Sequence, residues 1–540
     1  MFRKLAVAFS VANLCFFKSW REILSPQTLG RLYFWKEYPS HAAGVALGVN
    51  LLLLTALFLI VFTILWRRGS GMRNVVRVAF LIVFLRALNG VRIQFETLST
   101  GHLRSLLGRV GFFAVGLALI ALLLFLLLRF GLAMVTRGAI TVALVMAPFG
   151  LIGVAQFSWW TFRYRHYWHD QPSASALSVD RDHEARVVWI IFDEMSQYQA
   201  FSHRAPDLAM PNFDRLVSES FAAANAFPPA GHTSQSLPAL LTGKLISTVQ
   251  PVAPNELMLQ FHNRSAPAKW SEEPDIFSEA RRAGFNSALV GWYHPYCRIE
   301  GSRLTSCYWQ PANLFGDPDR FSIIKNFRHQ AADLLTLIPF TKPVQTWLSP
   351  RGPDDYRTPQ LAVYQMLIAA AKNKLSDRNP GLTFIHLPVP HPPYIYNRQK
   401  KAFDTHGQLE YSDNLALADQ ALGELRATLE RSGLWEGTTI IVSSDHWWRT
   451  DFWKPVKNFW SEEDALNQPP QVDHRIPLII HFAGQKTEMV YEPQLNTVLT
   501  HDLVLELLKK GITKPEDIKD WFDRNRTIGE SPYQTYADEP

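Results

Sequence analysis

The most constraining feature of this chain is a run of apolar residues at 42–66, AAGVALGVNLLLLTALFLIVFTILW, which carries no charge. A helix needs about 20 mostly apolar residues to cross the hydrocarbon core of a bilayer. Residues 111–128 and 138–157 are two further uncharged runs of similar length, and 75–91 is a weaker one because two arginines interrupt it. The first third of the chain is therefore predicted to be a membrane domain.

The basic residues predict the orientation of this domain. The linker at 67–73, RRGSGMR, has the densest positive charge and is placed in the cytoplasm. The last apolar run then ends outside, and an odd number of helices keeps Arg3 and Lys4 inside. We therefore predict a transmembrane domain at 1–157 and a C-terminal part on the extracytoplasmic face. The expected helices of the transmembrane domain cover 5–20, 42–66, 75–91, 111–128 and 138–157. The short apolar run that begins the chain suits a signal peptide, but no small-residue cleavage site follows it.

Charge is distributed unevenly along the chain. Residues 1–186 contain 20 Lys and Arg against 7 Asp and Glu, whereas the whole chain has a net charge of +6, so the remainder is net negative. The basic residues flank apolar runs, where they contact lipid head groups, and a nucleic-acid partner is excluded. Arg86 lies within a run and either reaches the interface or contacts a lipid phosphate.

Two of the three cysteines, Cys297 and Cys307, lie ten residues apart in a polar stretch. Their spacing, C-x9-C, is not a zinc-binding pattern. They are either two free thiols or a disulfide, and the disulfide requires that this part of the chain face an oxidising compartment.

Strands and helices alternate after a linker at 158–186, whose aromatic residues suit the depth of the lipid head groups. Four short apolar runs predict strands: ARVVWIIFDE, LTFIHLPVPH, TTIIVSSDHWW and HRIPLIIHFAG. Helical patterns lie between them, at PNFDRLVSESFAA, DIFSEARRAG and YSDNLALADQALGELRATLERSG. This alternation predicts an α/β domain over 187–540 with a mostly parallel central sheet.

Metal-binding residue types gather where these predicted strands end, which is where ligands bind in open α/β sheets. They are Asp193, Glu194, His386, His391, Asp445, His446, His474 and Arg475, with Thr233 between the first strand and the next helices. Hard carboxylate oxygens with an imidazole suit Zn, Mn, Mg or Ca. A hydroxyl bound to the same metal becomes a nucleophile near neutral pH. Taken alone, Thr233 is better explained as a helix cap and His391 as an exposed loop residue. Together these residues favour a site.

Seven motifs occur in the order seen in the alkaline phosphatase/sulfatase superfamily: VVWIIFDE, PNFDRL, GHTSQSLPALLTG, HLPVPHPPYIY, YSDNLALADQALGEL, IIVSSDH and HRIPLII. With the preceding spans, the layout resembles the membrane-bound phosphoethanolamine and phosphoglycerol transferases, including lipoteichoic acid synthase. The resemblance implies an N-terminal α-helical transmembrane bundle followed by an α/β alkaline-phosphatase-like (sulfatase-fold) domain. It also implies the cytoplasmic (inner) membrane of a bacterium, with the catalytic domain on the extracytoplasmic or periplasmic face.

The resemblance implies a role for individual residues. Thr233 corresponds to the nucleophile. A divalent metal ion would be held by Thr233, Asp445, His446 and either or both of Asp193 and Glu194. Four further residues are assigned to the substrate: His232, His391, His474 and Arg475.

Several residues of this sequence differ from the superfamily motifs, and these differences restrict the reactions that we expect. Formylglycine sulfatases need Cys or Ser at the nucleophile position, with Pro two and Arg four residues later, whereas this chain has Thr233, Gln235 and Leu237. Phosphoethanolamine transferases commonly carry a cysteine just before the threonine, where this chain has His232. The usual glycine after the Asp-His pair is Trp447.

The sequence hypothesis is a metal-dependent transferase that moves a phospho-head group, of phosphoglycerol or phosphoethanolamine type. The donor is a membrane phospholipid, the acceptor is an envelope glycan or lipid, and the intermediate is a phosphothreonine. One alternative is a membrane-tethered phosphodiesterase that uses water as the acceptor. Another is a catalytically inactive relative that serves as an envelope scaffold, which the tryptophan after Asp-His motivates.

Overall fold

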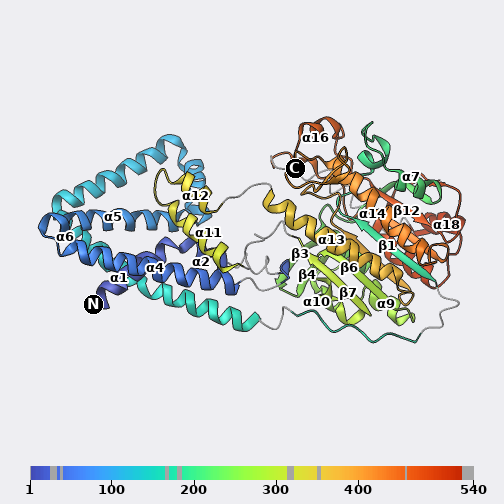
Figure 1. The fold of residues 1–540 in the computed structure, drawn as a ribbon, viewed down its shortest axis with the longest axis horizontal. Coiled ribbons are helices and arrows are strands. Elements are labelled where there is room, and N and C mark those ends of the chain that lie inside the picture. Colours follow the sequence, from blue (N-terminus) through green and yellow to red (C-terminus); the bar gives the residue numbers. More distant parts are fainter. Residues whose placement is uncertain are drawn as a thin grey trace. The chain divides into compact units, whose positions relative to one another are not determined.

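The structure is a computed structural model that describes residues 2–24, 33–36, 40–164, 169–178, 185–312, 322–349, 354–456 and 459–525 (Figure 1). The chain forms two compact units. The first contains Met1–Thr28, Glu37–His166 and Pro318–Arg351, and the second contains Leu29–Lys36, Tyr167–Asp317 and Gly352–Pro540. The domain boundaries expected from sequence therefore differ from these units in two stretches. A short N-terminal segment belongs to the second unit, and a segment from the middle of the chain belongs to the first.

The described residues of the first unit form helices. They are α1 (Phe2–Cys15), α2 (Phe17–Leu24), α4 (Ser40–Trp66), α5 (Ser70–Arg92), the 3-10 turn η1 (Glu96–Leu98), α6 (Thr100–Tyr164), α11 (Ile323–Leu335) and α12 (Lys342–Leu348). Among the described residues, three helices are long and apolar enough to cross a membrane, over Ala42–Trp66, Ser70–Arg92 and Thr100–Arg163.

The helix α6 contains both apolar runs that we expected as separate spans, 111–128 and 138–157. Its backbone leaves the helical region at Gly108 and Gly131, where φ is 67° and 74°. Residues with a side chain rarely take such φ values, so these glycines are natural break points. The span expected at 5–20 is instead two short helices of 14 and 8 residues, α1 and α2. The five-helix topology and its sidedness remain predictions.

The helix α11 packs along α4 although about 280 residues separate them in the sequence. Asn50 of α4 donates through Nδ2 to Gln330 Oε1 at 3.0 Å and to Phe327 O at 3.2 Å. Lys18 of α2 pairs with Asp333 at 2.7 Å. These polar contacts tie the inserted segment to the N-terminal helices.

The second unit is built on a central sheet (Figure 1). Its strand order is β13-β2-β12-β11-β1-β8-β6-β7, with β14 beside β2. The strands are β1 (Arg186–Phe192), β2 (Phe221–Phe227), β6 (Ser287–Tyr293), β7 (Ser306–Pro311), β8 (Leu382–Leu387), β11 (Thr438–Ser443), β12 (Ile476–His481), β13 (Met489–Tyr491) and β14 (Leu495–Asn496). The strand β12 is antiparallel to both neighbours, β11 and β2, and the other pairings are parallel. The expected mostly parallel sheet is confirmed.

Smaller elements complete this unit. A three-stranded sheet contains β3 (Ile246–Ala253), β4 (Glu256–Phe261) and β5 (Ala268–Lys269), and β9 (Tyr396–Asn397) pairs with β10 (Ala402–Phe403). The helices are α7 (Pro211–Ser218), α8 (Thr233–Thr242), α9 (Ile276–Arg282), α10 (Tyr296–Ile299), α13 (Asp354–Ser376), α14 (Tyr411–Arg431), α15 (Thr450–Trp453), α16 (Glu462–Asn467), α17 (Thr500–Leu508) and α18 (Pro515–Asn525). Single turns are η3 (Tyr198–Ser202), η4 (Trp270–Glu272), η5 (Gly301–Arg303), η8 (Trp435–Gly437) and η9 (Thr497–Leu499).

The central strand β1 shows why its sequence is continuously apolar. Val187, Trp189 and Ile191 belong to a core shared with α8, α9, α17 and α18. The alternate residues of the strand, from Val188 to Phe192, belong to a second core shared with α7, α13 and α14. Because successive strand residues point to opposite faces, a strand covered by helices on both sides carries no polar face.

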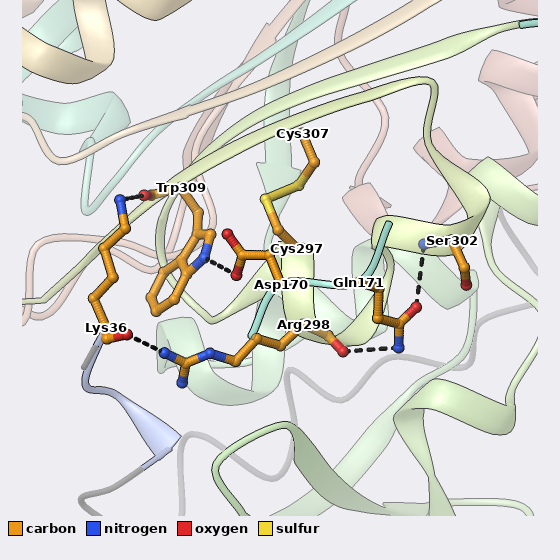
Figure 2. Close-up of a disulfide and its surroundings, with 8 residues drawn as sticks. All are labelled: Lys36, Asp170, Gln171, Cys297, Arg298, Ser302, Cys307 and Trp309. Atoms are coloured by element: carbon orange, nitrogen blue, oxygen red, sulfur yellow. Dashed lines mark hydrogen bonds between the residues drawn. A yellow bond between two sulfur atoms is a disulfide. The ribbon is translucent and has the colours of Figure 1, made fainter. Parts of the chain in front are cut away.

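The four strands expected from sequence are β1, β8, β11 and β12. The helix expected over 211–223 is wrong beyond Ser218, because the strand β2 begins at Phe221. Its sequence, FAAANAF, has little local strand preference, and pairing with β12 and β13 determines its conformation. Cys297 and Cys307 form a disulfide, which decides between the two alternatives left open by the sequence (Figure 2).

Candidate active site

The candidate site lies at the carboxyl ends of neighbouring parallel strands. Asp193 directly follows β1, and Asp445 and His446 follow β11. The two loops are tied together, because the backbone N–H of Glu194 donates to Asp445 Oδ1 at 3.1 Å. The strand register therefore fixes the acids beside one another.

Thr233 is the first residue of α8, and its hydroxyl points into this group. Its Oγ1 lies 3.2 Å from Asp193 Oδ2 and 3.1 Å from His446 Nε2. The preceding residue, His232, is extended and exposed, and its side chain does not cap the helix. The capping role that the isolated sequence favoured is therefore not what Thr233 does, because its side chain faces the acids.

Asp193, Asp445 and His446 form a group in which a ligand atom of each lies within 4.8 Å of the others. All three side chains are fully buried. Asp193 Oδ1 and Asp445 Oδ2 have no hydrogen-bond partner among the described residues. His446 Nδ1 lies 2.9 Å from Trp447 O and donates to it, which leaves the lone pair of Nε2 free. Buried, unpartnered carboxylate oxygens facing an imidazole lone pair fit a divalent cation.

The protonation of the two acids follows from their burial. Burial, together with the nearby charge of Asp193, raises the pKa of Asp445 to about 7. Burial likewise raises the pKa of Asp193 to about 6. Burial lowers the pKa of His446 well below its usual value, so its imidazole is neutral near pH 7. A cation between these groups would favour both carboxylates in their charged form.

Glu194 turns away from this group and pairs with Arg449. Its Oε1 accepts hydrogen bonds from the backbone N–H of Arg449 at 2.9 Å, from Arg449 Nε at 3.2 Å and from Trp453 Nε1 at 2.8 Å. Burial alone would raise the pKa of Glu194, but the Arg449 guanidinium outweighs it and lowers that pKa. Glu194 also lies near Asp193 and His391 in a second group of possible ligands. The closest partners of the Glu194 carboxylate, however, are the hydrogen-bond donors of Arg449 and Trp453.

Arg449 was not foreseen from the sequence, and it organises the opposite side of the site. Its two terminal nitrogens lie 2.9 Å from His232 Nδ1 and 3.4 Å from His391 Nε2. His391 Nε2 is also 3.5 Å from Glu194 Oε2. Two of the residues assigned to the substrate thus meet around one guanidinium. Its only sequence signal is an arginine four residues after Asp445.

His474 and Arg475 have other partners. Arg475 forms an ion pair with Asp473 at 2.7 Å, and the ring of His474 packs 4.2 Å from the ring of Trp447. Trp447 in turn covers Gly231, where a Cβ atom would lie only 2.7 Å from the indole. Trp447, which stands where the superfamily usually has glycine, therefore packs on the residue two before Thr233.

His386, the last-but-one residue of β8, supports Asp193 from the other neighbouring strand. Its Nε2 lies 3.0 Å from Asp193 Oδ2, and its Nδ1 lies 3.0 Å from the carbonyl oxygen of Trp292. Burial lowers the pKa of His386 to about 4, so the imidazole is neutral. This contact orients the acid that faces Thr233.

Comparison with known proteins places this geometry in a family. The family model described as Sulfatase matches residues 185–509, which contain every predicted site residue. Among solved structures, the chain is similar to the PsFucS1 sulfatase from Pseudoalteromonas sp., with 16% identity over 63% of this chain and 74% of that one, and a TM-score of 0.40. It is also similar to the phosphonate monoester hydrolase of Agrobacterium radiobacter, with 15% identity over 61% and 78% and a TM-score of 0.38. A protein of the alkaline phosphatase superfamily from Vibrio parahaemolyticus has 13% identity over 62% and 68%, with a TM-score of 0.36. No match was found among curated proteins.

Proposed function

Because the chain belongs to the sulfatase family of the alkaline phosphatase superfamily, we propose that it is a metal-dependent phosphotransferase with Thr233 as its nucleophile. Members of the superfamily are hydrolases or transferases that act on sulfate or phosphate esters. The observation that carries the proposal is the position of Thr233 Oγ1, which lies 3.2 Å from Asp193 and 3.1 Å from His446. It lies beside two buried carboxylate oxygens that lack partners among the described residues.

Asp193, Asp445, His446 and the Thr233 hydroxyl are the residues that would hold the divalent ion, which can be Zn, Mn, Mg or Ca. Such an ion lowers the pKa of a bound hydroxyl and neutralises charge on a phosphoryl group. Glu194 has a different task in this proposal, because Arg449 and Trp453 occupy its carboxylate.

In the first step, Thr233 Oγ1 attacks the phosphorus of a phospholipid head group and gives its proton to the Asp193 carboxylate 3.2 Å away. The bond from phosphorus to the diacylglycerol oxygen breaks, and that oxygen takes a proton to leave as diacylglycerol. The Arg449 guanidinium, held against His232 and His391, stabilises the negative charge that develops on the phosphoryl oxygens. His391 is the proposed proton donor to the leaving oxygen.

In the second step, a hydroxyl of the acceptor attacks the phosphothreonine and gives its proton to His391, which lost one in the first step. The bond between phosphorus and Thr233 Oγ1 breaks, and Thr233 regains its proton from Asp193. The sum of the two steps converts a phospholipid and a hydroxyl into diacylglycerol and a new phosphodiester. We propose an envelope glycan or lipid as the acceptor and a phosphoglycerol or phosphoethanolamine head group as the transferred group.

Formylglycine-type sulfatase chemistry is not proposed for this chain. The two positions that such enzymes need as Pro and Arg are Gln235, which donates to Ser247 O at 3.1 Å, and Leu237, which is fully buried in the core. Both residues have structural roles here, and Thr233 itself is not a precursor of formylglycine.

The long apolar helices support a membrane phospholipid as the donor, because they are long enough to anchor the chain in the bilayer that contains such lipids. The disulfide between Cys297 and Cys307 supports an oxidising compartment. We therefore propose that the protein lies in the bacterial cytoplasmic membrane with its second unit on the extracytoplasmic face.

The proposal is tested with the full-length protein in nanodiscs that contain head-group-labelled phosphatidylglycerol or phosphatidylethanolamine. With Mn²⁺ present we expect diacylglycerol release and a phosphorylated Thr233 peptide in mass spectra. Thr233→Ala should lower turnover by about 10³-fold or more. Ser234→Ala is the matched control, because it removes the neighbouring hydroxyl, and it should retain turnover. Undiminished transfer by Thr233→Ala would overturn the mechanism.

The same assay separates the alternatives. Release of the free phospho-head group at the same rate with and without added oligosaccharide would favour a phosphodiesterase that uses water. Absence of both stoichiometric metal and diacylglycerol release would favour an inactive scaffold. The unpartnered oxygens of Asp193 and Asp445 argue against the scaffold, because burying them without a cation is costly.

A further inference from the structure

A four-residue segment from between α2 and α4 is part of the second unit. Tyr33–Lys36 belong to that unit, although the helices before and after them in sequence belong to the first. Tyr33 is fully buried and belongs to the hydrophobic core beneath α8 and α9. The segment is therefore integrated into the second unit and is not a surface contact.

The C-terminal end of this segment is anchored beside the disulfide (Figure 2). The carbonyl of Lys36 accepts a hydrogen bond from the Arg298 guanidinium, and Lys36 Nζ donates to Trp309 O at 3.1 Å. Arg298 directly follows Cys297, and its guanidinium lies 5.0 Å from the ring of Trp309. The disulfide to Cys307 joins the two stretches that carry these partners, α10 and β7.

From this anchor, Tyr33 reaches the nucleophile through one histidine. Tyr33 Oη lies 2.8 Å from His294 Nδ1, and His294 Nε2 lies 3.1 Å from the carbonyl oxygen of Thr233. The carbonyl only accepts, so Nε2 must carry the imidazole proton, and Nδ1 then accepts from the tyrosine hydroxyl. The Tyr33 hydroxyl is therefore the donor to His294, and His294 is the donor to the Thr233 carbonyl.

Aromatic rings surround the histidine. Trp270, Tyr293 and Tyr296 lie edge-on to His294 with ring centroids at 5.0, 5.1 and 5.6 Å. His294 and Tyr33 are both fully buried. The Tyr33 hydroxyl therefore meets Nδ1 inside the protein core, away from bulk solvent.

We propose that Tyr33 is a positioning residue for Thr233, acting through His294, and that the segment Tyr33–Lys36 completes the site. The inference rests on the proposed role of Thr233 as nucleophile. Fixing the carbonyl of Thr233 fixes the backbone from which its side chain extends toward Asp193 and His446. A nucleophile whose backbone can rotate spends less time in the attacking position, so the rate of the bound complex falls while substrate affinity does not.

The test uses the full-length, Mn²⁺-loaded protein and bis(4-nitrophenyl) phosphate as the probe. Tyr33→Phe should lower kcat by about 3- to 10-fold, the usual equivalent of one lost hydrogen bond, and should leave KM unchanged. His294→Leu should lower kcat further. His294→Gln should recover part of the loss, because its amide can still donate to Thr233 O.

Tyr364→Phe is the matched control, because the Tyr364 hydroxyl is also buried but has no hydrogen-bond partner among the described residues. It should keep the wild-type kcat. Bound Mn²⁺ and the unfolding temperature, measured for every variant, identify any that fail to fold. Wild-type kcat in a folded Tyr33→Phe variant, with Thr233→Ala inactive, overturns this inference and leaves the proposed nucleophile intact. An active Thr233→Ala variant instead overturns the proposed function.

Discussion

Asp193 and Glu194 are adjacent in the sequence but have different partners in the structure. Asp193 faces Thr233 and His446, whereas Glu194 is bound by Arg449 and Trp453. The backbone of Glu194 has φ 65°, within a turn that directly follows β1. This φ is uncommon for a residue with a side chain, and the surrounding hydrogen bonds hold it in place.

We therefore expect substitutions of the two acids to affect different properties, metal binding for Asp193 and stability for Glu194. Asp193→Asn should remove most of the bound Mn²⁺ and abolish turnover. Glu194→Gln should keep the metal but lower the free energy of unfolding by about 3 kcal/mol, because the largely buried Arg449 loses its charged partner. Metal content by mass spectrometry and unfolding by denaturant measure the two effects. Loss of metal from a stably folded Glu194→Gln variant would contradict this division of roles.

The sequence predicted these acids but not the arginine, for a physical reason. A strand that ends in acids is visible in a local pattern, because burial makes the preceding residues apolar. Arg449 follows the tryptophans of an irregular loop, and only the folded chain shows that its guanidinium meets Glu194, His232 and His391. The same limit hid Tyr33 and His294, whose partners are distant in sequence.

At the level of elements, the site is formed where the carboxyl ends of β1 and β11 meet the start of α8. The strand ends were predictable because parallel neighbours end at the same edge of a sheet. The strand β2 was not, because its alanine-rich sequence gains its conformation from pairing with β12. Sequence therefore predicted the strands whose ends carry the acids, but not the strand β2 that pairs further along the sheet.

Because two buried carboxyl groups come from these ends, metal binding should depend on pH. Burial raises the pKa of Asp193 to about 6 and that of Asp445 to about 7, above the value of about 3.9 in an unfolded chain. The folded metal-free protein thus holds more protons than the unfolded chain between about pH 4 and 7, so its stability falls as pH rises through this range. A cation requires both groups deprotonated, so its stabilising effect grows over the same range.

We expect the increase in Tm on adding excess Mn²⁺ to be small at pH 5 and to reach its maximum near pH 8. Thermal unfolding of the full-length protein with and without Mn²⁺, at each pH, measures this difference. Asp445→Asn is the control, because it removes one of the two titrating ligands and should leave only a small increase at every pH. An increase in the wild-type protein that does not change between pH 5 and 8 would show that these carboxylates do not bind the ion.

At the scale of the whole molecule, the chain passes between its two units more often than the sequence suggested. The predicted domains were consecutive, at 1–157 and 187–540, whereas Pro318–Arg351 belongs to the helical unit and Leu29–Lys36 to the second. A short amphipathic helix such as α11 has the same pattern whether it packs on a sheet or on another helix. The polar partners of α11 determine which of the two it packs on, and they lie about 280 residues away in sequence.

The contact between Asn50 and Gln330 tests this assignment. The Asn50 side chain donates to Gln330 Oε1 at 3.0 Å, and both side chains are buried within the helical unit. Asn50→Ala leaves a buried amide without its partner and should lower stability by about 1–2 kcal/mol. Gln330→Ala should cost a similar amount, and the double variant should cost less than the sum, because each single change already removes the same hydrogen bond. Thermal unfolding in nanodiscs measures the cycle. Fully additive effects would mean that the inserted helix does not pack on α4 in the membrane.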